Sequence, residues 1–233
     1  MEQEVKISTA TQEGSVASAM LTRSPKEVCD RIVVFLDIMG FKDLVARQSE
    51  TNINKKLHTL CTFIAAQVSS ENLVQFSIFS DSIILFSNEL TEEAFRTMVQ
   101  LSALIVEKSI ELGLPIRGAI ASGECTVTNE KIPYYFGQPI VDAYTLEENL
   151  VLYGVVLHNT VEQFAVSCED KPELIFDYKV PLKGGASKHY VVNWFGKNYG
   201  QNMENITKIR NTVSDSPRRY IDATLECFAS LKK

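Results

Sequence analysis

A change in hydrophobic period along the chain is the feature that most constrains the fold. Apolar residues run together or alternate in some segments, as in strands, and recur every three to four residues in others, as in helices. Glycine and turn-forming residues separate these segments. In chain order, the pattern predicts a strand over 31–37, a helix over 42–69, strands over 73–79 and 82–87, a helix over 91–112 and a strand over 115–121.

This β-α-β-β-α-β order predicts an α+β fold with a ferredoxin-like core, in which the helices lie on one face of an antiparallel sheet. A tight turn at Ser80-Asp81 joins the two consecutive strands. Further elements are expected beyond the core: a helix over 138–149, a strand over 153–157, a helix over 159–166, a hairpin of 173–179 and 188–195, and a C-terminal helix over 216–231.

The N-terminal residues form a separate segment by composition. Residues 1–25 are rich in Ser, Thr, Ala, Gln and Glu and lack a clear period, which predicts a flexible arm ending near Ser24-Pro25. The remaining residues, 26–233, are predicted to form a single domain, since a chain of 233 residues can build one sizeable core.

Composition excludes several classes of partner. The net charge of −6 leaves no broad basic surface for duplex nucleic acid, although a local cluster of Lys or Arg could still bind a small phosphate ligand. The five cysteines are scattered without metal-ligand spacing, which favours free thiols in a reducing compartment. No segment resembles a signal peptide or a membrane span, so we expect a cytoplasmic protein without a membrane partner.

The stretch "VVFLDIMGF" places one acid, Asp37, at the end of an apolar run. A carboxylate there is costly unless a positive group lies against it. In the predicted core the first and third strands are neighbours, so Asp37 and Asp81 can meet at one edge of the sheet. Two carboxylates that repel each other favour a bound divalent cation, Mg²⁺ or Mn²⁺, with the carbonyl of Ile38 as a further ligand.

The residues after this strand suggest a phosphate site. The helix predicted to follow "MGFK" could hold a phosphate through the amides of Gly40 and Phe41. Together these groups indicate nucleotidyl chemistry by two metals. The alternative is that Asp37 caps the helix and Asp81 occupies an ordinary turn, as either acid alone would suggest. The pair on this topology favours the metal site.

Five blocks in order, "FLDIMGFKDL", "FSIFSDSIILF", "LPIRGAIASGE", "YFGQPIVDAYTLEE" and "VPLKGGASKHYVV", resemble the class III nucleotide cyclases over about residues 30–195. The resemblance implies a head-to-tail homodimer with two active sites at its interface. In that arrangement one subunit supplies the metal acids, and the other supplies the groups that recognise the base and hold the phosphates.

The resemblance also implies roles for single residues. Asp37 and Asp81 match the family's catalytic metal aspartates, which hold two cations per active site, and Ile38 matches the residue that lends a carbonyl. Lys183 matches a triphosphate-binding lysine, with a solvated turn lysine as the alternative. Arg117 matches a strand arginine that we interpret as structural.

Two departures bear on the substrate. At the family's base-recognition positions this chain has Ser77 and Tyr134, which belong to neither purine set. A tyrosine fills space that a purine needs, so a smaller base is favoured; the alternative is that Tyr134 fills the dimer interface. The combination is similar to the pyrimidine cyclases of Pycsar anti-phage systems. That similarity implies cyclic UMP or cyclic CMP as product, with UTP favoured, and a separate effector that the messenger activates.

A third departure concerns the transition state. The family's ribose-orienting Asn and transition-state Arg are replaced by Val141 and Thr145. Loss of that charge is expected to slow phosphoryl-type transfer, unless another cation substitutes. No histidine lies in a nucleophile motif, which gives no indication of acid–base catalysis by histidine. The candidate substitute cations are Lys131, Lys42, Lys188, Arg218 and Arg219.

Three functions therefore remain open from the sequence. The first is a pyrimidine nucleotide cyclase, the second a purine (adenylate or guanylate) cyclase with an atypical base pocket, and the third a nucleotide-binding sensor without catalysis.

Overall fold

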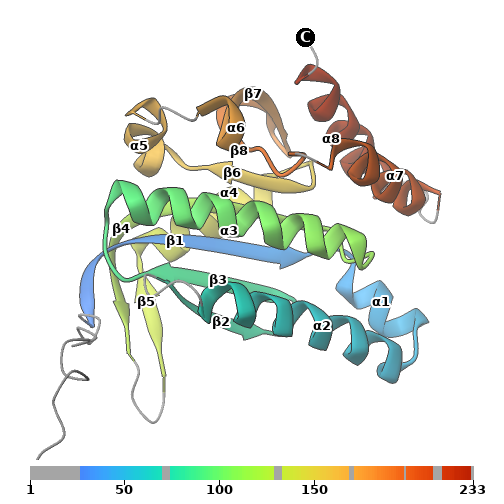
Figure 1. The fold of residues 1–233 in the computed structure, drawn as a ribbon, viewed down its shortest axis with the longest axis horizontal. Coiled ribbons are helices and arrows are strands. Elements are labelled where there is room, and N and C mark those ends of the chain that lie inside the picture. The colour runs from blue at the N-terminus through green and yellow to red at the C-terminus, as the bar shows by residue number, and fades with distance from the viewer. Residues whose placement is uncertain are drawn as a thin grey trace, which may run out of the picture.

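The computed structural model describes most of the domain predicted from the sequence (Figure 1). The structure describes residues 27–69, 74–128, 133–167, 171–196, 198–211 and 217–231. The predicted arm, 1–25, lies outside these described residues.

The core is one mixed sheet of eight strands in the order β2-β3-β1-β4-β6-β8-β7, with β5 paired to β4. All of its strand pairs are antiparallel except that between β4 and β6. The strands are β1 (Val28–Ile38), β2 (Val74–Phe79), β3 (Ser82–Ser87), β4 (Ile116–Val127), β5 (Tyr135–Gly137), β6 (Gly154–Leu157), β7 (Ile175–Leu182) and β8 (Gly185–Val192).

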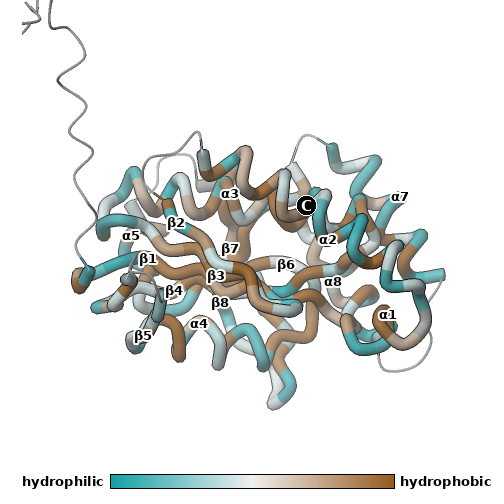
Figure 2. Tube along the Cα trace, turned by 90° about the horizontal axis from the view of Figure 1, so that it is seen from below, coloured by the Kyte–Doolittle hydropathy of each residue, from teal (hydrophilic) through white to brown (hydrophobic). Residues whose placement is uncertain are grey.

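Helices cover both faces of this sheet. Figure 1 shows α2 and α3 side by side in front of the strands, and Figure 2 shows α3 and α4 on opposite sides of them. The helices are α1 (Phe41–Arg47), α2 (Glu50–Ser69), α3 (Glu92–Glu111), α4 (Gln138–Asn149), α5 (Glu162–Ser167), α6 (Lys171–Leu174), α7 (Tyr199–Arg210) and α8 (Arg218–Ser230), with a 3₁₀ turn, η1, over Asn159–Val161.

The central strand β1 is buried on both of its faces, which explains its continuous apolar run. The ring of Phe35 meets the ring of Tyr144 on α4 edge-on, with 5.5 Å between the ring centres. Because side chains alternate along a strand, Asp37 lies on the same face as Phe35, the face that α4 covers. Leu36 lies on the other face, which α2 and α3 cover.

The predicted β-α-β-β-α-β core is confirmed, with both strands of its hairpin within one residue of their predicted limits. The single helix predicted over 42–69 is wrong. Two helices, α1 and α2, occupy that range, because Gln48 adopts an extended conformation with φ −110° and ψ 154°. The short strand β5 and the helix α7 were not predicted, and β4 extends six residues beyond 121.

The C-terminal helices pack beside the part of the sheet that contains β6 and β8. The predicted helix over 216–231 is present as α8, and α7 precedes it. The side-chain oxygen of Thr224 on α8 accepts a hydrogen bond of 2.8 Å from the main-chain N–H of Tyr153, beside β6. Phe228 packs against Trp194 and Phe195, which follow β8, so α8 contributes to the core.

A membrane-spanning helix must be both long and predominantly apolar, and none of the helices in the described ranges meets both requirements.

Close packing of β1 against β4 gives a test of the fold. A methyl group on Gly118 would lie 2.4 Å from Leu36 Cδ2 and 2.5 Å from the carbonyl oxygen of Phe35. We expect Gly118→Ala to lower the free energy of unfolding by about 2 kcal/mol, measured by urea denaturation, because backbone and core must move. Gly184→Ala is the control, since nothing lies within 4 Å of its added methyl group. Equal stability of the two variants would contradict this packing.

Candidate active site

The two acids predicted as metal ligands lie at the same end of the sheet. Asp37 stands opposite Ser82 of β3, and Asp81 is the second residue of the two-residue turn that precedes Ser82. The main-chain N–H of Ile38 donates a hydrogen bond of 2.9 Å to the carbonyl oxygen of Asp81. This bond fixes the turn against the end of β1, although Ser80 takes a left-handed conformation there, with φ 57°.

The electrostatics of Asp37 reflect this proximity. Burial and, to a smaller extent, the negative charge of Asp81 raise the pKa of Asp37 to about 6, against the opposing effect of the positive charge of Arg117. Asp81 therefore lies close enough to Asp37 to affect its ionisation in the folded chain. A group whose pKa is raised by a neighbouring carboxylate is one that a cation would stabilise in its charged form.

The chemistry of the oxygens at this end of the sheet fits a hard divalent cation. Carboxylates and carbonyls are the ligands that Mg²⁺ and Mn²⁺ prefer. No cluster of three or more His, Cys, Asp or Glu side chains suited to a metal occurs in the described part of the chain. Two acids with a main-chain carbonyl would therefore leave coordination positions for water and substrate phosphate, as is usual for Mg²⁺.

A buried ion pair lies directly beside Asp37. Arg117 of β4 stands opposite Asp37 in register, and its Nε donates a short hydrogen bond to Oε1 of Glu147 on α4. One Nη group of Arg117 lies 3.4 Å from the carbonyl oxygen of Leu150. Only 2% of Glu147 is exposed, so this pair joins α4 to the centre of the sheet. The interpretation of Arg117 as structural is compatible with these contacts.

The residues predicted to bind phosphates lie in turns. Gly40 precedes α1 with φ 73°, a left-handed conformation that suits glycine, and Phe41 is the first residue of the helix. Lys183 lies in the exposed turn between β7 and β8. Its Nζ is 3.9 Å from Oε1 of Glu148 at the end of α4, and its N–H donates to the carbonyl of Asn149. The ammonium group is thus accessible and only loosely held.

The two residues predicted to recognise the base are far apart within one chain. Ser77 stands opposite Ile84, which stands opposite Phe35, so Ser77 lies on the same face as Asp37 and near its end of the sheet. Tyr134 precedes β5, which pairs with the other end of β4. Nine positions of β1 separate these two ends, about 30 Å in an extended strand. The folded chain does not bring Tyr134 and Asp37 together.

The replaced catalytic positions lie on α4. Val141 and Thr145 are both exposed, four residues apart and therefore on one side of the helix. Lys131 lies outside the described residues, and the remaining candidate cations are exposed. These are Lys42 on α1, Lys188 on β8, and Arg218 and Arg219 on α8.

Sequence reasoning missed two features of this site. Glu147 was not singled out, because "LEENL" contains two adjacent glutamates and only the packing of α4 decides which is buried. The exposed ring of Phe79 was also missed. Phe79 stands opposite Ser82, which stands opposite Asp37, so these three residues form one row across the face. A hydrophobic strand end beside a turn carries no signal for such exposure.

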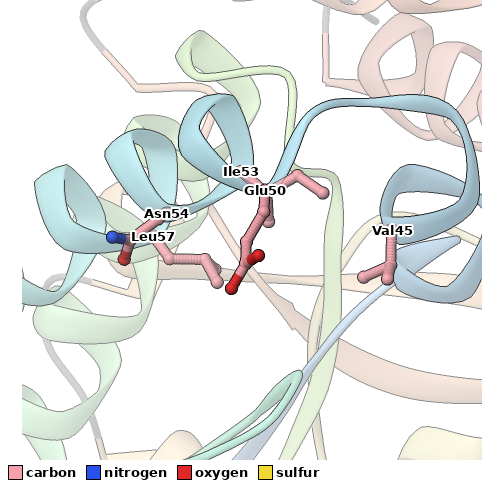
Figure 3. Close-up of a pocket in the computed structure, with 5 residues that line it drawn as sticks. All are labelled: Val45, Glu50, Ile53, Asn54 and Leu57. Atoms are coloured by element: carbon pink, nitrogen blue, oxygen red, sulfur yellow. The ribbon is translucent and has the colours of Figure 1, made fainter.

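A pocket of about 490 Å³ lies between α1 and α2 (Figure 3). Figure 3 shows the carboxylate of Glu50 directed away from the helix axis, between the side chains of Leu57 and Val45. The residues predicted from the sequence to form the site are not among those that line this pocket. Its lining comprises Val45, Glu50, Ile53, Asn54 and Leu57.

Comparison with known proteins gives a uniform result at the level of fold. The chain matches the guanylate cyclase domain of RhGC from Catenaria anguillulae in complex with GTP at 18% identity and a TM-score of 0.54, covering 70% of this chain and 96% of that one. It matches the adenylyl cyclase CyaB from P. aeruginosa at 16% identity and a TM-score of 0.56, covering 71% and 95% of the two chains.

A bacterial light-regulated adenylyl cyclase also matches, at 16% identity and a TM-score of 0.54, over 78% of this chain and 98% of that one. No family model and no curated protein matches the sequence. The chain therefore has the fold of a class III nucleotide cyclase catalytic domain, as the five sequence blocks predicted.

The raised pKa of Asp37 makes a prediction for the metal-free protein. The pKa of Asp37 is about 6 in the folded chain, against 3.8 for an ordinary aspartate, so the folded chain binds this proton more tightly than the unfolded chain does. The contribution of Asp37 to the free energy of unfolding therefore increases as the pH falls from about 7 to about 4. At pH 8, Asp37→Asn should stabilise the protein by about 1 kcal/mol, a value reduced for partial exposure.

Thermal or urea unfolding with chelator present, between pH 5 and pH 8, measures this difference. Asp177→Asn, on the exposed face of β7, is the control for removal of one negative charge. A variant at Asp37 that is no more stable than wild type at pH 8 would contradict the predicted repulsion.

Proposed function

We propose that the protein is a metal-dependent nucleotide cyclase that converts a pyrimidine nucleoside triphosphate to its 3′,5′-cyclic monophosphate and pyrophosphate. The observation that carries this proposal is the meeting of Asp37 and Asp81 at one end of a sheet with the class III cyclase fold. The titles of the matched structures name guanylate and adenylyl cyclases. We assign cyclase activity to this chain because it combines this fold with the two acids.

The active site is proposed to form between two copies of the chain. Tyr134 and Asp37 lie at opposite ends of β1 and β4, so they can serve one substrate only if Tyr134 comes from a second copy. A dimer interface that includes β5 and the exposed side of α4 is supported by apolar side chains that these two elements leave exposed. These are Tyr134 and Phe136 at β5, and Val141 and Tyr144 on α4.

The groups near Asp37 have distinct parts in the reaction. When bound, two Mg²⁺ or Mn²⁺ ions held by Asp37, Asp81 and the carbonyl of Ile38 would act as Lewis acids for the ribose 3′-hydroxyl and the triphosphate. The 3′-oxygen forms a bond to the α-phosphorus, the bond to the departing pyrophosphate oxygen breaks, and the hydroxyl proton passes to solvent. The amides of Gly40 and Phe41 bind phosphate oxygens.

Lys183 is proposed to neutralise the departing pyrophosphate. Its ammonium group is accessible and lies 3.9 Å from Glu148, a distance at which an exposed ion pair contributes little. Binding to a phosphate in place of this carboxylate therefore costs the folded chain little free energy. Lys183 is on the exposed turn between β7 and β8, and the proposed head-to-tail dimer would bring it to a substrate held by the acids of the other copy.

The choice of a pyrimidine rests on the residues at two positions. Ser77 has a half-buried hydroxyl that can donate or accept, and Tyr134 has a large ring that is half exposed. Neither supplies the lysine or acid that the purine cyclases of this family use, and the ring takes up volume. UTP is favoured over CTP on the resemblance to Pycsar enzymes. The messenger would then activate a separate effector in anti-phage defence.

One observation favours a second function. Val141 and Thr145, at the positions of the family's Asn and Arg, are exposed side chains without a charge. A chain that binds nucleotide through its acids but lacks transition-state stabilisation from α4 would be a nucleotide sensor. Such a protein binds a nucleoside triphosphate with Mn²⁺ and releases no pyrophosphate, which separates it from a cyclase of either base specificity.

Incubation with each of the four nucleoside triphosphates and Mn²⁺, followed by mass analysis, tests the proposal. We expect cyclic UMP as the main product, and a rate lower by roughly 100-fold or more in Asp37→Ala and Asp81→Ala, because the cations lose their charged ligands. Asp177→Asn is the control. Turnover of ATP or GTP alone contradicts the pyrimidine assignment, and undiminished activity of both alanine variants contradicts the metal site.

The base positions have their own test. The double variant Ser77→Lys, Tyr134→Asp carries the purine-type residues and should turn over ATP at least about tenfold faster than wild type, since one matched hydrogen-bonding group changes selectivity by this order. The measured quantity is the ratio of kcat/KM for ATP to that for UTP. If purine turnover is already dominant in wild type and merely rises, the chain is a purine cyclase with an atypical pocket.

A further inference from the structure

Arg117 is placed between two carboxylates that differ in their surroundings. On β4, Arg117 stands directly opposite Asp37 of β1. In a hydrogen-bonded pair of antiparallel strands the two Cα atoms are about 5.5 Å apart. From α4, Glu147 accepts its Nε–H. Within the described residues, the ion pair of Arg117 is with Glu147 and not with Asp37. The positive charge that acts on Asp37 is therefore already balanced by a residue outside the proposed cation site.

The contact with Glu147 is enforced by burial. The side chain of Glu147 is 2% exposed and that of Arg117 is 10% exposed, so water screens neither charge well. The second contact of Arg117, to the carbonyl of Leu150, also comes from the end of α4. Both contacts draw the guanidinium toward α4. Burial raises the pKa of Asp37 to about 6 and that of Glu147 to about 7, and the positive charge of Arg117 acts on both acids in the opposite direction.

We propose that Glu147 is a positioning residue that binds Arg117 and so prevents it from pairing with Asp37, which keeps the carboxylate of Asp37 available to a divalent cation. This inference rests on the proposed cation site and gives a role to a residue that neither the sequence analysis nor that proposal singled out.

The charges explain the effect. With Glu147 ionised, Arg117 and Glu147 cancel, and Asp37 with Asp81 presents two negative charges to a cation. Without the negative charge of Glu147, Arg117 cancels one of those charges, either from its present place or after turning to Asp37. The affinity for a divalent cation then falls, because the attraction scales with the net charge that the cation meets.

Two single variants separate this role from a general effect of charge. Glu147→Gln keeps the shape and an oxygen that can accept the Nε–H of Arg117, but removes the charge. Glu148→Gln makes the same change at the next residue, which is 53% exposed and faces Lys183 instead. Binding of Mn²⁺ to the chelator-treated protein, measured by electron paramagnetic resonance of free Mn²⁺, gives the dissociation constant without requiring catalysis.

We expect the Mn²⁺ dissociation constant to rise roughly tenfold in Glu147→Gln and by less than about twofold in Glu148→Gln, as the difference between an unscreened and a solvent-screened charge predicts. An unchanged constant in Glu147→Gln overturns the inference, and so does an equal rise in both variants. If wild type binds no Mn²⁺, the proposed function and this inference fail together. If wild type binds Mn²⁺ but forms no cyclic product, only the cyclase assignment fails.

A second background tests whether Glu147 acts through Arg117. In Arg117→Gln the competing positive charge is absent, and the buried carboxyl of Glu147, without its counter-ion, is protonated and neutral, so adding Glu147→Gln should leave the Mn²⁺ dissociation constant unchanged. A tenfold loss that persists there means that Glu147 attracts the cation directly, which overturns the positioning role. The double variant pairs two neutral side chains of similar size, so it remains informative if a single variant fails to fold. It should bind Mn²⁺ at least as tightly as wild type.

Discussion

The balance of charge beside the end of β1 is the constraint on which the site depends. Asp37 is part of the central strand and is held near Asp81, because the main-chain N–H of the next residue, Ile38, donates a hydrogen bond to the carbonyl oxygen of Asp81. The structure therefore holds two carboxylates near each other in a partly buried place, with Arg117 alongside. Such an arrangement costs free energy that a ligand of opposite charge would offset, and this is the physical basis of the proposed metal site.

The same constraint links the site to the packing of α4. This helix covers the face on which Asp37 lies, and its buried Glu147 determines where the guanidinium of Arg117 rests. Its exposed side carries Val141 and Thr145, so the helix packs on the core through one face and leaves the other face exposed, where the proposed dimer interface would form. A change in α4 would therefore alter both the charge near Asp37 and any surface formed with another copy.

The sequence predicted the core well where short-range patterns determine structure. The hairpin at Ser80-Asp81 and the long helix α3 follow from period and turn residues, because neighbouring residues make most of the contacts involved. The break at Gln48 was not predicted, because the polar stretch 47–52 fits the exposed side of one long helix as well as a break between two helices. The short strand β5 exists only because β4 offers it an edge.

The sequence by itself determined the order of the core elements, the acids at 37 and 81 and their meeting at one edge, because adjacency of the first and third strands follows from topology. Only the tertiary structure decided that Glu147 rather than Glu148 is buried against Arg117, and that Tyr134 lies at the opposite end of the sheet from Asp37. The physical reason is that burial and separation across a sheet depend on contacts between residues distant in the chain, and local patterns do not encode those contacts.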